Sequence, residues 1–540
     1  MSSAALPASP PAVPAPAPPS VLGRVLSGTF WMALKTPIAV VIALWSIPLT
    51  QRYIGPVANG DYVFAWNFGF IQFLLEFGMG SALQKQMVDA YTRGDRDAVN
   101  RTIACGMNFY AAVAVVQMLI LGAIAHAGLL PARFQGNSLV FGVLWILILS
   151  TPFLGISTVV GSVLQAARRY EFLPKLDLAI IVARFGMLWI GFWTGADFLW
   201  IVAGQVALQV GLSLIPSLWV MVKELGYRPH FGGATRADYS AMMQVSVYMA
   251  LIQWSVVLAD KVDTTVLGYA LGGPDSEFLL TVYQNVSKPF LQIRQTGWTL
   301  VFLVMPAVVS LHIGGDKDGL ERVKYDGTRL LVALLAPVAL LAGIFAGPFL
   351  AAWVGPRYAP YGWMLRLFLV ATIPLGLSVI GQMAVGMGQI KVVAISSLAG
   401  ALVNLPLSYY LTRRLGVSGV IWGTVLTTLV SNLIVPAIYL FRALDIRYAT
   451  FFRRALGAPA CGALALLAAC WAFGWVLPAD FDPEARGRLA GAWPLLANLA
   501  VGSTAYLAGY AASPTGRGDL AAIGRKLLRR PRPAPGGLAG

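Results

Sequence analysis

One apolar segment, residues 278–310, carries polar side chains at a spacing that could bind a ligand. The residues recur every three or four positions, so on a helix they would share one face. A polar stripe with a lysine at its centre fits neither a lipid-facing surface nor a dry core, and we interpret it as the lining of a cavity. The alternative is polar contact between neighbouring helices. The stripe consists of Thr281, Gln284, Asn285, Lys288, Gln292, Gln295 and Thr299.

Further charged side chains lie inside other apolar segments, where a charge costs about 2.5–3.5 kcal/mol on insertion scales. The deep cations are Lys35, Arg184, Lys288 and Arg294, and the deep anion is Glu76. An excess of cations suits an anionic ligand such as a diphosphate or an acidic sugar, because arginine grips phosphate bidentately and lysine acts as a movable point charge.

Two of these cations have alternative interpretations. Arg184 lies seven residues after Asp177, so the two could form a mutual salt bridge. Arg294 falls about 100° away from the stripe and could face a neighbouring helix. The residues expected to bind substrate are Lys35, Arg184, Thr281, Gln284, Lys288, Gln292, Arg294 and Gln295.

Three acidic residues are candidates for coupling transport to H+ or Na+: Glu76, Asp260 and Asp263. Asp260 and Asp263 flank Lys261 near one membrane surface, where a solvated helix end is the alternative. The sequence contains no GxxxxGK[ST] motif, so we expect no ATPase activity, and transport must be passive or driven by an ion gradient.

No residue pattern indicates catalysis or metal binding. The three cysteines lie in apolar segments, the three histidines are scattered, and HExxH and CxxC motifs are absent. We therefore expect that the protein is not an enzyme and that it has no catalytic residues, no metal and no cofactor. A membrane polymerase or ligase for lipid-linked sugars would need a sizeable extracytoplasmic loop, but the expected loops on that side are short. A non-transporting scaffold for polysaccharide synthesis would not need the polar stripe.

The elements that position these residues follow from composition. The chain is 58% hydrophobic and 11% charged, with mean hydropathy +0.71, whereas soluble domains carry about 25% charged residues. We expect an all-α polytopic membrane protein with about fourteen segments of about 20 apolar residues each.

The net charge of +16 does not indicate nucleic-acid binding. Most lysines and arginines fall in short loops on one side of the expected spans, which the positive-inside rule assigns to the cytoplasm. We therefore expect a multi-pass protein of the bacterial inner (plasma) membrane with both termini in the cytoplasm.

The chain also repeats itself. Gly94-Asp95-Arg96-Asp97 matches Gly315-Asp316-Lys317-Asp318, and Gly195 matches Gly416 at the same offset. Such a parallel repeat predicts two six-helix lobes around a central site. The expected divisions are a disordered Pro/Ala-rich cytoplasmic tail (1–23), an N-lobe (24–225), a C-lobe (226–445), two further spans (446–512) and a basic cytoplasmic tail (513–540).

Several short motifs, in order along residues 25–445, resemble the polysaccharide-transporter (O-antigen flippase) branch of the multidrug/oligosaccharidyl-lipid/polysaccharide (MOP) exporter superfamily. The motifs are Arg52-Tyr53-Ile54-Gly55, Gly60-Asp61-Tyr62, Glu76-Phe77-Gly78-Met79-Gly80-Ser81, Asp263-Thr264-Thr265-Val266-Leu267-Gly268, Tyr283, Gly386-Met387-Gly388, Asn404 and Leu415-Gly416-Val417-Ser418-Gly419-Val420.

The resemblance implies fourteen helices in two lobes. It implies a flippase that moves a polyprenyl-diphosphate-linked oligosaccharide to the periplasmic leaflet by alternating access, for exopolysaccharide or lipopolysaccharide (O-antigen) export. Relatives bind the diphosphate or acidic sugars with cavity cations, a role that Lys35, Lys288, Arg184 and Arg294 could take. Contact with polysaccharide polymerase or export machinery is a further expectation. The alternatives are a cation-coupled multidrug exporter of the same superfamily and a lipid II flippase.

Overall fold

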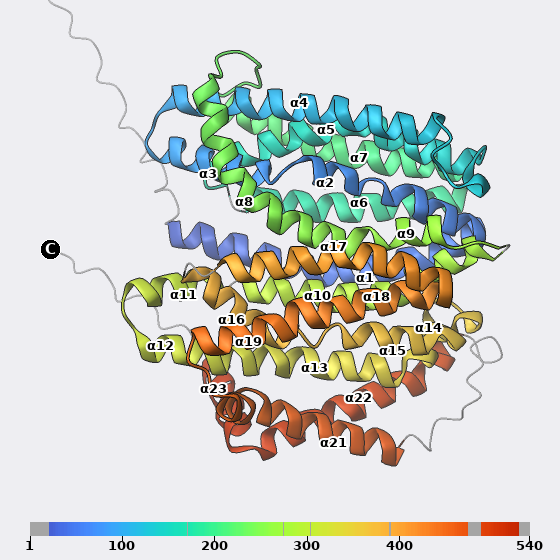
Figure 1. The fold of residues 1–540 in the computed structure, drawn as a ribbon, viewed down its shortest axis with the longest axis vertical. Coiled ribbons are helices and arrows are strands. Elements are labelled where there is room, and N and C mark those ends of the chain that lie inside the picture. The colour runs from blue at the N-terminus through green and yellow to red at the C-terminus, as the bar shows by residue number, and fades with distance from the viewer. Residues whose placement is uncertain are drawn as a thin grey trace, which may run out of the picture.

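The computed structural model describes residues 21–169, 171–273, 275–302, 304–387, 390–473 and 488–528. All regular elements within these ranges are helices, as expected, and Figure 1 shows them running roughly parallel in one elongated bundle. The Pro/Ala-rich start of the chain and its last twelve residues lie outside the described residues. The expectations of a disordered tail at the start and of a basic tail at the end therefore stay predictions there.

Within the described ranges, eleven helical stretches are long and apolar enough to cross a membrane, or twelve if a bent pair counts as one span. The bent pair lies in α8 (Arg236–Lys261). Two of the expected spans are merged in α1 (Val21–Asn67), and α10 (Ser276–Phe302) is too polar to qualify because it carries the stripe. Counting α10, the bent α8 and both parts of α1 accounts for the expected fourteen.

The first half of the chain forms one side of the bundle in Figure 1. In α1, Gly55 interrupts the helix with φ 79°, a conformation that glycine adopts without strain. After this break the chain returns through two shorter helices and then crosses four more times. These helices are α2 (Phe70–Leu75), α3 (Met79–Thr92), α4 (Arg96–His126), α5 (Ser138–Ala166), α6 (Phe172–Thr194) and α7 (Phe198–Trp219).

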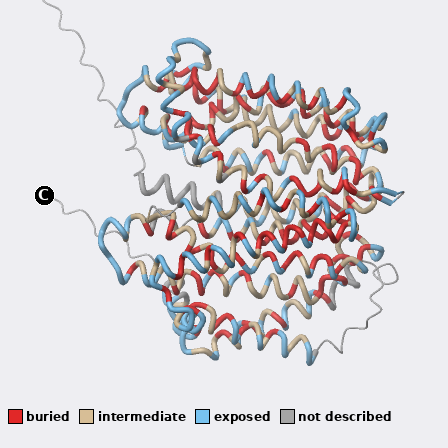
Figure 2. Tube along the Cα trace, in the orientation of Figure 1, coloured by how far each residue is buried: buried red, intermediate tan, exposed pale blue. Residues whose placement is uncertain are grey.

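The second half packs beside the first. Buried residues are dense around α10 (Figure 2), which packs against α1 of the first half. Besides α8 and α10, the second half contains α9 (Asp263–Ala270), α11 (Val304–Ile313), α12 (Lys317–Arg322), α13 (Thr328–Ile344), α14 (Ala346–Trp353), α15 (Gly362–Val370), α16 (Leu375–Gly386), α17 (Ile390–Leu415), α18 (Val417–Leu429) and α19 (Val435–Ala443).

The repeated motifs have the same local structure in both halves. Gly94 and Gly315 have φ 70° and 66°, and the aspartate that follows each glycine caps the next helix through its side chain. The paired glycines of the other motif, Gly195 and Gly416, have φ 70° and 65°. We call the end of the bundle with Gly94 and Gly315 the inner end, and the end with Gly195 and Gly416 the outer end, after the orientation expected from the sequence.

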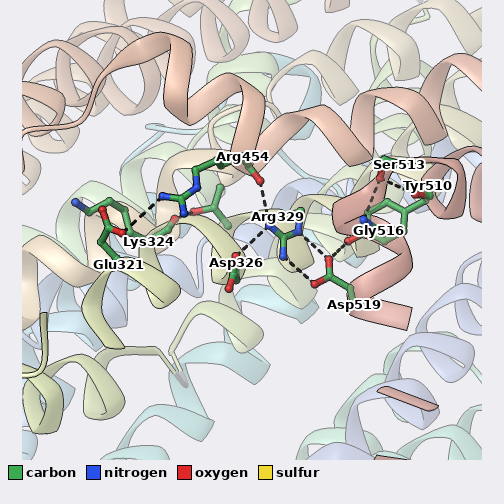
Figure 3. A network of polar contacts seen from close by, with 10 residues as sticks. Glu321, Lys324, Asp326, Arg329, Arg454, Tyr510, Ser513, Gly516 and Asp519 are labelled. Atoms are coloured by element: carbon green, nitrogen blue, oxygen red, sulfur yellow. Dashed lines mark hydrogen bonds and ion pairs between the residues drawn. The ribbon is translucent and has the colours of Figure 1, made fainter. Parts of the chain in front are cut away.

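The last helices are α20 (Tyr448–Phe451), α21 (Gly457–Phe473), α22 (Arg488–Ala512) and α23 (Pro514–Leu528). Of these, α21 and α22 pack against α13, and α23 packs against α21 and α22. The segment expected to be a basic tail thus begins as a helix, which an ion pair holds to the bundle (Figure 3). Asp519 of α23 accepts hydrogen bonds from Arg329 Nε (2.7 Å) and Nη2 (2.8 Å) and from the Tyr510 hydroxyl (2.5 Å).

Candidate functional site

The outer part of the α10 stripe is bonded to α1. Thr281 donates to the carbonyl oxygen of Pro56 (2.6 Å), and Asn59 donates to Thr281 Oγ1 (3.0 Å) and Gln284 Oε1 (2.8 Å). Asn285 and Gln51 exchange amide hydrogen bonds at 2.6 and 3.3 Å. In this conformation the outer residues therefore join the two halves of the molecule, which was the alternative interpretation of the stripe.

The inner part of the stripe is different. Lys288 and Gln292 are half-buried, while Gln295 and Thr299 are exposed. Lys288 has no hydrogen bond or ion pair with any described residue, and the side chains of Gln292 and Gln295 make none within the same ranges. The Thr299 hydroxyl donates to the Gln295 carbonyl oxygen at 2.9 Å. The side chains of Lys288, Gln292 and Gln295 thus remain free to bind a ligand on one helical face, and one of them is a cation.

Lys35 and Arg184 are both held by neighbouring helices. Lys35 Nζ forms an ion pair with Asp177 of α6 at 2.8 Å, and the two side chains are 28% and 52% exposed. Arg184 instead donates to Gln209 Oε1 of α7 at 2.7 Å. The mutual Asp177–Arg184 salt bridge considered from the sequence is therefore wrong. An arginine can reach several helices, and its sequence spacing from an acid does not decide which acceptor it finds.

Arg294 faces α8, the neighbouring-helix placement considered from the sequence. It forms an ion pair with Asp260 and stacks over Phe290, with its guanidinium carbon 5.2 Å from the ring centroid. Asp260 is thus paired, so it is not a free carboxylate at a solvated helix end. Of the four deep cations, only Lys288 is without an ionic or hydrogen-bonding partner among the described residues.

Lys35 and Lys288 lie at different depths. The Gln51–Asn285 contact aligns α1 with α10, which run in opposite directions. At 1.5 Å per residue, Lys35 lies about 24 Å inward from this contact and Lys288 about 5 Å inward. The two amines are therefore about 20 Å apart along the bundle axis, too far to hold one phosphate together in this conformation.

Asp263 is the most enclosed of the acidic candidates, with 4% exposure. Its Oδ2 accepts hydrogen bonds from Tyr283 (2.9 Å) and Thr424 (2.7 Å), and Asn404 Nδ2 lies 3.5 Å from its Oδ1. These partners come from α10, α18 and α17, so one carboxylate joins four helices of the second half. The sequence did not identify Thr424 as a candidate site residue, because a threonine inside an apolar helix is common.

Glu76 lies where the second span is broken. Phe77 and Gly78 have φ 48° and 69°, which ends α2 and leaves carbonyl groups without helical partners. Side chains of α8 satisfy these groups: Gln253 donates to the Phe73 carbonyl (2.8 Å) and to Glu76 Oε2 (3.3 Å). The Glu76-Phe77-Gly78 motif therefore docks the first half onto α8.

The outer end of the bundle is closed by a contact between the halves. Arg133, in the loop between α4 and α5, donates to the carbonyl oxygens of Gly268 and Leu271 at 2.7 Å each. Its Nε lies 3.6 Å from a carboxylate oxygen of Glu277. The Tyr269 hydroxyl donates to the Leu129 carbonyl at 3.0 Å. At the inner end, by contrast, α3 and α4 lie apart from α11 and α12 (Figure 1).

Comparisons with solved structures show the fold. The chain superimposes on the lipid II flippase MurJ, in an inward closed conformation, with a TM-score of 0.68 at 14% identity, covering 94% of this chain and 100% of that one. An inward-facing multidrug resistance MATE family transporter of the MOP superfamily gives 0.56 at 15% identity, covering 76% and 94%.

Comparisons of sequence show the family. The uncharacterized membrane protein EpsK of Bacillus subtilis (strain 168) is 23% identical over 474 residues, which is 83% of this chain and 89% of that protein. Residues 25–297 match the family described as polysaccharide biosynthesis protein. With the fold of the MOP superfamily structures around a polar stripe on α10, this multi-pass membrane chain belongs to the polysaccharide biosynthesis protein family.

Proposed function

We propose that the protein flips a polyprenyl-diphosphate-linked oligosaccharide from the cytoplasmic to the periplasmic leaflet of the bacterial inner membrane, for exopolysaccharide or O-antigen export. The observation that carries the proposal is Lys288, an unpaired cation among the described residues, on the polar face of α10 where the two halves meet. Family membership supports the same substrate class.

The chemistry of the inner stripe suits such a ligand. A half-buried amine without a described counter-ion favours the arrival of an anion, because an unpaired buried charge is costly. The diphosphate supplies that anion, and the neighbouring amide groups of Gln292 and Gln295 can both donate to and accept from sugar hydroxyl groups. An excess of acidic groups would instead suit cationic drugs.

The mechanism we propose is alternating access between an N-lobe (24–225) and a C-lobe (226–445), with residues 446–512 outside the moving pair and both termini in the cytoplasm. In the conformation described, contacts through Arg133 and through Thr281 and Asn285 hold the outer end closed. Opening that end would separate α10 from α1. The outer part of the stripe would then face the central cavity between the two lobes. The ligand could pass from Lys288 to this outer part of the stripe.

We further propose that Asp263 binds the coupling cation, either H+ or Na+. The hydroxyl oxygens of Thr424 and Tyr283 lie against the carboxylate, and hard cations prefer oxygen ligands. Because its partners come from α10, α17 and α18, charging this site would change how three helices of the C-lobe pack. Asp260 and Glu76 are less suited, since one is paired with Arg294 and the other is bonded to α8.

The test uses cells that lack the gene and that accumulate the lipid-linked repeat unit on the cytoplasmic leaflet. Wild type and the Lys288→Arg variant are expected to restore its appearance on the periplasmic leaflet, and Lys288→Ala is not. Lys317→Ala is the matched control, because Lys317 is an exposed cation at the inner end of the bundle. If lipid-linked sugar reaches the periplasm normally without the gene, the flippase proposal is wrong.

A lipid II flippase is the second candidate, because the MurJ structure is matched over its whole length. Its test is the same assay with lipid II as the measured lipid. A multidrug exporter of the superfamily would show drug sensitivity on deletion with no change in either lipid. Contact with a polysaccharide polymerase or with export machinery is a further proposal, and co-purification from membranes tests it.

A further inference from the structure

A cavity of about 990 Å³ lies on the outside of the second half of the bundle. Its walls come from α13, α15, α16, α19 and the start of the segment that leads into α21, and no described residue of α10 lines it. Since α10 contacts α13, α15 and α16, one layer of helices separates this cavity from the stripe. The cavity is thus a different site from the one proposed for transport.

The cavity is long and runs along the bundle axis. On α13 it extends from Leu331 to Ile344, which is about 20 Å at 1.5 Å per residue. Gly343 lies level with Leu369 of α15, and Leu335 approaches Leu375 of α16 beside Gly297. The hydrocarbon core of a bilayer is about 30 Å thick, so the groove matches one extended hydrocarbon chain lying along the membrane normal.

The lining is apolar except at one end. Arg366 is the one charged residue among the described residues that line the groove. It lies one turn outward from Leu369, is exposed, and makes no hydrogen bond or ion pair within the described ranges. Trp363, on the same face one turn further out, is 46% exposed, as is usual for the aromatic belt at a membrane interface.

We propose that this groove holds an anionic phospholipid of the outer leaflet, with one acyl chain along α13 and its phosphate on Arg366. Arg366 lies near the outer end of its span and has no partner among the described residues, which favours binding of an anion from the membrane. A guanidinium group binds phosphate bidentately. The site would be a resident lipid site that supports the α13–α19 side of the C-lobe. It does not depend on the proposed transport function.

The test is native mass spectrometry of the purified full chain, titrated with phosphatidylglycerol or phosphatidylcholine. Wild type should retain about one phosphatidylglycerol in preference to phosphatidylcholine. Arg366→Gln should weaken phosphatidylglycerol binding about tenfold and remove the preference. Ala339→Trp, which fills the groove, should abolish retention. Arg413→Gln is the control, because Arg413 is an exposed cation at the outer end that does not line the groove.

A second measurement locates the acyl chain of the bound lipid. A phosphatidylglycerol with a photoactivatable acyl chain should label peptides of α13 and α19 in wild type and in Arg413→Gln, and not in Ala339→Trp. The proposal fails if Arg366→Gln binds both lipids as wild type does, since Arg366 would then only reach into the interface. It also fails if the retained lipid is a lipid-linked sugar, or if labelling is unchanged in Ala339→Trp.

Discussion

Replacing Asp519 by asparagine is expected to release α23 from the bundle. The wild-type carboxylate accepts two hydrogen bonds from Arg329 and one from Tyr510, and the Arg329 and Asp519 side chains are 7% and 15% exposed. Removing one partner of a buried ion pair costs about 3–5 kcal/mol. The cost here is reduced because Arg329 keeps Asp326 at 3.0 Å and the Arg454 carbonyl at 3.1 Å. We expect a loss of about 2 kcal/mol.

Hydrogen exchange measures this loss directly. A loss of about 2 kcal/mol raises the population in which α23 is undocked about 30-fold, so amides of α23 should exchange about that much faster in the Asp519→Asn variant. The matched control is Asp326→Asn, which removes the other carboxylate on Arg329. Because Asp326 is 47% exposed, its pair contributes at most about 1 kcal/mol. Equal exchange in both variants, or unchanged exchange in Asp519→Asn, would refute the reasoning.

Three other predictions follow from named contacts. Burial alone would raise the pKa of Asp519, but the hydrogen bonds from Arg329 and Tyr510 outweigh it and lower the pKa. Docking of α23 should therefore be fully present above the ordinary aspartate pKa of about 3.9 and be lost as pH falls through the lowered value, which a fluorophore on α23 can follow. Arg133→Ala should loosen the outer end, because the hydrogen bonds to the carbonyl groups of Gly268 and Leu271 are lost, and a cysteine placed at Tyr269 should react with an impermeant thiol reagent severalfold faster. Asp263→Asn should remove the dependence of flipping on the cation gradient while the protein still folds, since an amide can keep the contacts to Thr424 and Tyr283; flipping that still follows Na+ or pH in this variant would contradict the assignment of Asp263.

The elements were largely predictable from the sequence, because apolar runs of sufficient length must form helices in a membrane. The exceptions have physical causes. The Phe77-Gly78 break interrupts a span that looks continuous by hydropathy, whereas α1 continues through the connection expected between the first two spans with a local break at Gly55. The start of the expected C-terminal tail forms α23, because Asp519 finds Arg329 at a separation of 190 residues, a contact that no local pattern shows.

The candidate site was predictable as a list of residues but not as a set of pairs. Spacing placed the α10 stripe on one face, yet it could not show that Thr281 and Asn285 bond to α1 while Lys288 remains unpaired among the described residues. Lys35 pairs with Asp177 across 142 residues, and Asp263 gathers partners from three other helices. Such pairings depend on helix packing, which the order of residues along one helix does not specify.

The central claim is that Lys288 holds the anionic head group of the flipped lipid. The most direct measurement is binding of the purified protein to a soluble polyprenyl-diphosphate analogue, compared among wild type, Lys288→Arg, Lys288→Ala and the Lys317→Ala control. We predict that Lys288→Ala weakens binding about tenfold or more, as expected for the loss of one charge-assisted contact, and that the other two variants bind nearly as wild type does. Equal affinity for the diphosphate in wild type and Lys288→Ala would contradict the account.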